Sequence, residues 1–132
     1  MASHHYLALN DLGRRELVTE GQVLDDLILL PLRNIVLFPN ETVPLRVRNP
    51  HYIAAIAGML ETSPLLHLGI VNLGEHAPIR DGFVGTSAEI RAVSAASSSS
   101  ADEIVLRAKG RHRFALLERP RRVDGVYVAK VR

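Results

Sequence analysis

The chain lacks cysteine and tryptophan, and only 5% of its 132 residues are aromatic. Without cysteine it can form neither a disulfide framework nor a cysteine-ligated zinc or iron–sulfur site. With so few aromatic side chains, any core must be built mainly from Leu, Val, Ile and Ala. Hydrophobic residues make up 47% of the chain, which is enough for one modest core. The length is that of a single domain.

Long apolar runs and a basic leader are also missing. The longest apolar stretches, residues 27–32 and 35–38, are far shorter than the roughly 20 residues of a membrane-spanning helix. The first ten residues contain no basic patch followed by an apolar run, which a secretory signal peptide requires. We therefore expect no membrane association and a cytoplasmic location, with the nucleus as a second compartment.

The side chains that carry out catalysis do not occur in the arrangements that common mechanisms need. The sequence contains no GxxxxGK[ST] phosphate-binding loop and no GxSxG nucleophile elbow. His51, His67, His76 and His112 lack the i, i+4 spacing of a metal-binding helix. His67 stands between two leucines, where we expect a strand residue that faces solvent. We predict that the protein is not an enzyme and has no catalytic residue, cofactor or metal.

Apolar residues alternate with polar ones along much of the chain, which is the pattern of half-buried β-strands. Gly110 is expected to bend the chain, and Asp124-Gly125 is expected to form a hairpin turn. The predicted strands cover residues 27–32 (resuming at 35–38), 43–47, 66–73, 83–93, 103–109, 113–118 and 126–132.

The apolar period changes from two to that of a helix after Asn49. Asn49 is a good N-cap, and Pro50 suits the first helical position because its missing N–H would have no partner there. We predict one helix over Pro50–Glu61, ending before Ser63-Pro64. Its apolar face is expected to contain Ile53, Ile56, Ala57 and Leu60.

These elements predict an α+β fold that is predominantly β, with six to seven strands and one short helix. Such a pattern favours a curled, partly closed sheet with the helix across one opening. Residues 1–26 are polar and irregular, and we expect them to form an extended N-terminal arm before a folded unit at residues 27–132. The chain stops within a strand pattern, from which we expect a truncated domain.

Charge is distributed unevenly along the chain. Residues 1–102 contain seven arginines and eleven acids, whereas residues 103–132 contain nine basic residues and three acids. A basic third suggests RNA binding with strong salt dependence. The regular interleaving with apolar residues favours solvated strand faces instead, and few aromatic side chains are available for base stacking. The candidate nucleic-acid contacts are Arg107, Arg111, Arg113, Arg121 and Arg122.

One ordered set of motifs resembles a known family. Residues 30–39 (Leu-Pro-Leu-Arg-Asn-Ile-Val-Leu-Phe-Pro), followed by Val-Pro-Leu-Arg-Val at 43–47, are similar to the opening of a LON substrate-binding domain. The predicted helix, the segment 85–90 and the segment 105–114 then follow in the order of that family. Within the family, the segments 85–90 and 109–114 resemble the cereblon-type versions.

The resemblance implies a PUA-like pseudobarrel that recognises proteins or polypeptide substrates without catalysing a reaction. Cereblon-type members belong to substrate receptors of cullin–RING ubiquitin ligases. They dock to a β-propeller adaptor through a helical second half, which residues 27–132 lack. Lon-type members are the substrate-recognition domains of ATP-dependent proteases. An RNA-binding PUA-like domain is the third alternative. Exposed aliphatic residues with arginines at the rim would suit protein recognition, and the candidate contacts are Pro39, Asn40, Glu41, Arg46 and Arg48.

Overall fold

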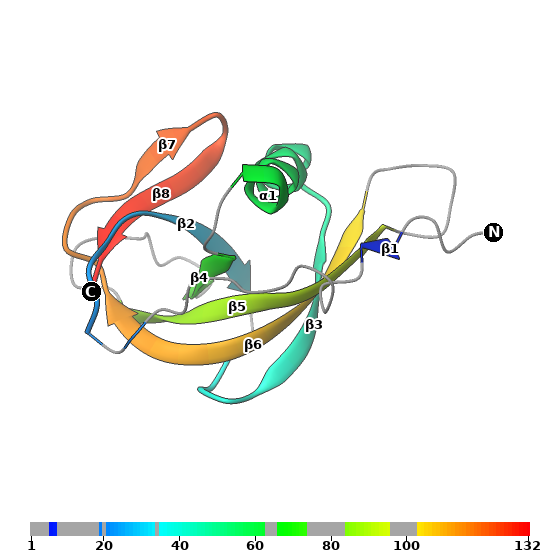
Figure 1. The fold of residues 1–132 in the computed structure, drawn as a ribbon. Helices are drawn as coiled ribbons and strands as arrows, with labels where there is room; N and C mark the ends of the chain where they lie inside the picture. Colours follow the sequence, from blue (N-terminus) through cyan, green and yellow to red (C-terminus); the bar gives the residue numbers. More distant parts are fainter. Residues whose placement is uncertain are drawn as a thin grey trace.

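The computed structural model describes residues 6–7, 19, 21–33, 35–62, 66–73, 84–95 and 103–132. Within these residues the fold is mostly β with one helix, as the sequence predicts (Figure 1). The helix has thirteen residues, and no helix among the described residues is long and apolar enough to cross a membrane. The elements are β1 (Tyr6–Leu7), β2 (Leu24–Arg33), β3 (Thr42–Val47), α1 (Pro50–Thr62), β4 (His67–Leu73), β5 (Val84–Ala95), β6 (Ile104–Ala115), β7 (Arg121–Val123) and β8 (Val126–Val131).

The strands form one sheet that closes on itself. Its order is β3-β6-β5-β4-β2-β8-β7, with β1 added to β5, and only the β2–β4 pair is parallel among the pairs described. Beyond the end of β6, the chain pairs with the end of β8. Ala115 and Arg132 exchange two backbone hydrogen bonds of 2.9 and 3.0 Å, and the Leu117 N–H donates to the Lys130 carbonyl at 2.8 Å. This contact closes the sheet into the predicted pseudobarrel.

Helix α1 lies across the open side of the curled sheet (Figure 1). Its start is as predicted, because the Asn49 side-chain oxygen accepts the His51 N–H at 2.8 Å and its carbonyl accepts the Ile53 N–H at 3.0 Å. The predicted apolar face was partly wrong, since Tyr52 and Ile56 are the buried residues and Ala57 is exposed.

Tyr52 joins the helix to the barrel. Its hydroxyl donates to the Leu29 carbonyl at 2.6 Å and accepts the Tyr127 N–H at 3.0 Å. Leu29 and Tyr127 are partners in the β2–β8 register. The hydroxyl therefore bridges two backbone groups of the ladder. Burial raises the pKa of Tyr52, which keeps the hydroxyl protonated and able to donate.

Two aliphatic clusters cover both faces of the central strands. The larger one lies beneath α1 and combines Ile56 with residues such as Leu68, Ile90 and Leu106. The smaller one lies near the closing contact and includes Leu29, Phe114 and other residues of β2, β4, β6 and β8. Residues 67–71 of β4 are buried on both faces, and Leu27–Leu30 of β2 lie between the two clusters, so these segments are nearly continuous apolar runs.

Several elements differ from the sequence prediction. Residues 35–38 are not a strand, and the predicted strands 103–109 and 113–118 form one continuous strand, β6. Gly110 lies within β6 and does not end it. β1 and β7 were not predicted, although the Asp124-Gly125 turn that joins β7 to β8 was. Its φ values of 50° and 84° fit the left-handed pair of a type I′ hairpin turn.

Candidate functional site

An exposed apolar segment follows β2. Ile35, Val36 and Phe38 are exposed, with 53% of Phe38 accessible, while Leu37 between them is buried. We call residues Ile35–Phe38 the Phe38 loop. A large aromatic side chain presented beside two aliphatic ones is an unusual surface for a protein of this size, because exposed apolar groups that gather in one place commonly mark interaction sites.

The Phe38 loop is held against the barrel by hydrogen bonds and by close packing. The Thr86 hydroxyl donates to the Leu37 carbonyl at 2.9 Å, and both residues are buried. The Asn40 N–H donates to the Gly110 carbonyl at 2.7 Å, and the Gly110 N–H donates to the Glu41 carbonyl at 2.8 Å. A side chain at Gly110 would collide with the Phe38 carbonyl. Glycine is thus needed at position 110 for close approach, where the sequence prediction assigned it a bend.

Three of the predicted protein contacts form the turn next to this loop. The Glu41 N–H donates to the Phe38 carbonyl at 3.1 Å, and the Glu41 carboxylate accepts the Phe38 N–H at 3.0 Å. Pro39 at the second position and Asn40 at the third, with φ of 71°, suit a type II turn. Pro39, Asn40 and Glu41 are all exposed. The structure therefore places these residues beside the exposed Phe38 ring.

Arg46 and Arg48 lie at the opposite end of β3 and are not brought to this turn. Their guanidinium groups contact the Glu103 carboxylate at 3.6 and 2.6 Å. Both arginine side chains remain about 70% exposed, so this ion pair is a surface feature. An arginine closer to the Phe38 loop is Arg113, whose guanidinium carbon lies 5.9 Å from the Phe38 ring centre. That distance permits a cation–π contact.

The five arginines of the nucleic-acid hypothesis do not form one surface with free charges. Arg111 contacts the Glu89 carboxylate at 3.8 Å, and Arg121 pairs with Asp26 and Glu118. Arg122 lies over the Tyr127 ring, with 4.7 Å from its guanidinium carbon to the ring centre, and Arg113 lies 5.9 Å from the Phe38 ring centre. Among the described residues, Arg107 has no such partner. The carboxylates beside Arg111 and Arg121 lower the attraction of these two residues for phosphate, which weakens this alternative.

His67 was predicted to face solvent, and this was wrong. It begins β4, and only 3% of it is exposed because both faces of that strand are covered. Burial lowers the pKa of His67 to about 4, and the positive potentials of Arg111 and His112 act in the same direction. Glu89, its partner in the β4–β5 register, opposes the shift. Neither ring nitrogen has a hydrogen-bond partner among the described residues. His67 is therefore a neutral imidazole at neutral pH.

The sequence prediction missed Phe38 because the segment was assigned to a strand. The signal was present, since the Leu-Phe-Pro-Asn sequence at residues 37–40 places a large ring just before a turn-forming Pro-Asn pair. The sequence does not show which side of this segment faces the barrel, because hydrogen bonds to Thr86 and Gly110 determine its orientation.

A β-barrel closed by the β6–β8 contact and capped by one helix is the architecture of the PUA-like fold class. Residues 26–132 match the family described as the ATP-dependent protease La (LON) substrate-binding domain. This match covers most of the chain, and the protein belongs to that family.

Relatives of two kinds resemble the chain. Protein cereblon from Xenopus tropicalis is 28% identical over 103 residues, which are 78% of this chain and 22% of that protein. Protein cereblon from Gallus gallus is 29% identical over 104 residues, again 78% of this chain and 22% of that protein. The matched region thus spans less than a quarter of these relatives.

Solved structures show the same fold. The Lon N-terminal domain protein from Xanthomonas campestris superposes with a TM-score of 0.65 at 27% identity, covering 83% of this chain and 59% of that one. The N-terminal domain of Mycobacterium avium complex Lon protease gives a TM-score of 0.56 at 18% identity, covering 82% of this chain and 53% of that one. The resemblance inferred from the motifs is confirmed at the level of the family and the fold.

Proposed function

We propose that this domain recognises polypeptide substrates through the Phe38 loop and the adjoining turn Pro39–Glu41, and that it performs no chemistry itself. The observation that carries the proposal is the exposed Phe38 ring on a backbone that is fixed by buried hydrogen bonds. Aromatic residues contribute strongly to binding at protein interfaces. A loop that is already ordered loses little conformational entropy on binding.

The surroundings of the loop suit a polypeptide better than a charged polymer. Ile35 and Val36 extend the apolar area, and Arg113 and Glu41 supply polar groups of both signs at its rim. Interfaces of this kind combine an apolar centre with a polar rim. Arg46 and Arg48 both contact Glu103 at the end of β3 that lies away from the turn. We propose these two arginines as a second, weaker contact for the substrate.

We further propose that residues 27–132 are the recognition unit of a cereblon-like substrate receptor of a cullin–RING ubiquitin ligase, working in the cytoplasm or nucleus, and that residues 1–26 are an arm in front of it. The similarity to two cereblon sequences supports this parent. In such a receptor, the helical second half would dock to a β-propeller adaptor. The superposition on Lon N-terminal domains supports the second candidate, the substrate-recognition domain of an ATP-dependent Lon protease.

Binding of an unfolded polypeptide tests the proposal. Fluorescently labelled, reduced and carboxymethylated α-lactalbumin should bind the protein, with fluorescence anisotropy changing little when salt is raised. Phe38→Ser should weaken binding about tenfold, which is a modest loss of affinity for the removal of one aromatic side chain from an interface. Val123→Ser is the matched control, because Val123 is also an exposed apolar residue but lies on β7.

Single-stranded RNA provides the contrasting probe in the same assay. We expect weak binding of RNA that Phe38→Ser leaves unchanged. Tight RNA binding that falls steeply with salt, together with no binding of the unfolded polypeptide, would overturn the proposed function in favour of nucleic acid.

A further inference from the structure

Strand β2 changes partners along its length, and among the described residues part of one edge has no partner strand. Its first half pairs with β8 up to Leu29, and its second half pairs with β4 from Leu29 to Arg33. Among the described residues, no strand pairs with Leu24–Ile28 on the side that faces β4. Backbone N–H and C=O groups of a strand point to both of its edges. The segment Leu24–Ile28 therefore offers main-chain donors and acceptors to an additional strand.

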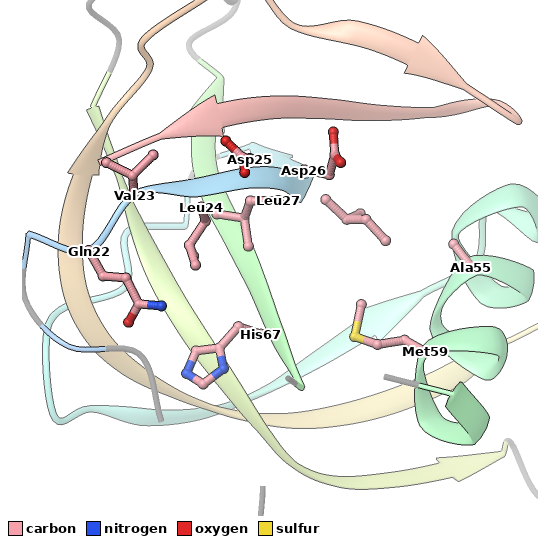
Figure 2. Close-up of a pocket in the computed structure, with 10 residues that line it drawn as sticks. Gln22, Val23, Leu24, Asp25, Asp26, Leu27, Ala55, Met59 and His67 are labelled. Atoms are coloured by element: carbon pink, nitrogen blue, oxygen red, sulfur yellow. The ribbon is translucent and has the colours of Figure 1, made fainter. Parts of the chain in front are cut away.

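A cleft of about 510 Å³ runs along this open edge. Its walls come from the first half of β2, from Ala55 and Met59 of α1, and from His67 at the start of β4 (Figure 2). This volume lies within the range of binding pockets. Figure 2 shows the Leu24 and Leu27 side chains on the side of β2 that faces His67, whereas Met59 reaches toward the cleft from the helix. The cleft therefore combines apolar side chains with the polar groups of Gln22 and His67.

The acids of the same segment do not give the interior a charge. Asp25 and Asp26 lie on the opposite side of the β2 ribbon from His67 and Met59 (Figure 2). They contact Lys130 and Arg121, respectively. A ligand group that enters the cleft consequently meets aliphatic side chains and the imidazole, while the nearby carboxylates disfavour an acidic group at the rim.

His67 supplies the polar feature of the cleft. The neutral imidazole has one donor and one acceptor nitrogen, and neither has a partner among the described residues although the residue is 97% buried. An unpaired buried polar group is costly, and a bound ligand that hydrogen-bonds to it lowers that cost. The main chain of a polypeptide carries both complementary groups.

We propose that this cleft binds an extended segment of the polypeptide substrate, which adds as a strand to Leu24–Ile28 and inserts one apolar side chain between Met59 and His67. Strand addition uses main-chain hydrogen bonds for affinity and a side-chain pocket for selectivity. An open strand edge beside an apolar pocket is the combination that this mode of binding requires. The inference rests on the proposed function, because it gives the same substrate a second contact, away from the Phe38 loop.

Short capped peptides test the proposal by NMR. An acetylated and amidated Gly-Ala-Leu-Ala-Gly peptide should produce saturable shifts at the amides of residues 22–28 and at the His67 imidazole. The peptide with Asp in place of Leu should bind at least about tenfold more weakly, the usual effect of one side chain in an apolar pocket. N-acetyl-leucine methylamide, which has no flanking residues, should also bind at least about tenfold more weakly.

Substitutions that fill the cleft with a larger side chain test the proposal by mutation. Ala55→Phe should abolish the shifts, whereas Ala54→Phe should preserve them because Ala54 is exposed on the same helix. Met59→Phe serves as the second filling variant if Ala55→Phe does not fold, as judged from its amide spectrum. Unchanged binding by a folded filling variant would overturn the proposal.

The remaining outcomes separate the two proposals. The cleft proposal is wrong if the Leu peptide produces no saturable shifts at residues 22–28 at concentrations up to about 10 mM, which covers even weak binding. Equal binding of N-acetyl-leucine methylamide would overturn strand addition and indicate a small-molecule pocket. Phe38→Ser should leave peptide binding at the cleft unchanged. If the cleft binds the Leu peptide but Phe38→Ser does not weaken binding of the long polypeptide, the proposed role of the Phe38 loop fails and the cleft proposal stands.

Discussion

Buried His67 should make the stability of the domain depend on pH between about 4 and 6.5. The folded protein keeps the ring neutral because burial lowers its pKa from 6.5 to about 4. Between these two values the unfolded chain binds a proton that the folded protein does not. Protonation therefore favours unfolding. The contribution of the neutral ring to stability is fully present above pH 6.5 and is lost as pH falls toward 4.

The size of the effect follows from the two pKa values. A change from 6.5 to about 4 corresponds to at most about 3 kcal/mol, at roughly 1.4 kcal/mol for each tenfold change in the protonation equilibrium. Relaxation around the ring reduces this value. Glu89 faces the ring and favours its charged form, whereas Arg111 and His112 disfavour it. A loss of about 3 kcal/mol is a large part of the stability of a small domain.

Urea unfolding of the wild type and of His67→Leu at pH 7.5, 6, 5 and 4 measures this contribution. Leucine retains an apolar group in the site and cannot be protonated, so the variant should lose less free energy of unfolding than the wild type as pH is lowered. His51→Gln is the matched control, since His51 is exposed, and it should retain the wild-type pH dependence. Equal pH dependence of the wild type and His67→Leu would refute this account of His67.

Four further substitutions test the contacts that hold the fold together. Tyr52→Phe leaves the Leu29 carbonyl and the Tyr127 N–H without their bridge and should cost about 1–3 kcal/mol in thermal or urea unfolding; an effect near zero would show that the bridge is dispensable. Gly110→Ala should cost about 1–3 kcal/mol and weaken polypeptide binding because the methyl group meets the Phe38 carbonyl. Gly58→Ala, in open space on α1, should instead be neutral or stabilising by up to about 1 kcal/mol. Arg48→Ala should change stability by less than about 1 kcal/mol because its pair with Glu103 is exposed; a larger loss would show that this pair holds β3 in place.

Much of the fold could be predicted from local patterns. Period-two alternation identified the interiors of β3, β5 and β8, and the Asn49-Pro50 pair identified the start of α1. The Asp124-Gly125 turn followed from the need for two left-handed residues in a tight hairpin. These features depend on neighbouring residues and on backbone geometry, so the sequence contains them directly.

Features that depend on distant partners could not be predicted. Residues 35–38 are as apolar as a strand, yet Leu37 alone turns inward because Thr86 and Gly110 bind the neighbouring backbone. His67 looked like a surface residue because period two cannot reveal that two apolar clusters cover both faces of β4. Of the candidate contacts, the turn Pro39–Glu41 lies beside Phe38, whereas Arg46 and Arg48 are separated from it along β3.

The central claim is that polypeptides contact the domain at the Phe38 loop, and site-specific photocrosslinking tests it most directly. A benzoylphenylalanine introduced in place of Phe38 should crosslink to bound carboxymethylated α-lactalbumin on irradiation, because that ring is exposed at the end of the loop, next to the turn Pro39–Glu41. The same group in place of Val123, which is exposed on β7, should give little product. Equal crosslinking at the two positions, or crosslinking at position 123 alone, would contradict the assignment of the recognition surface.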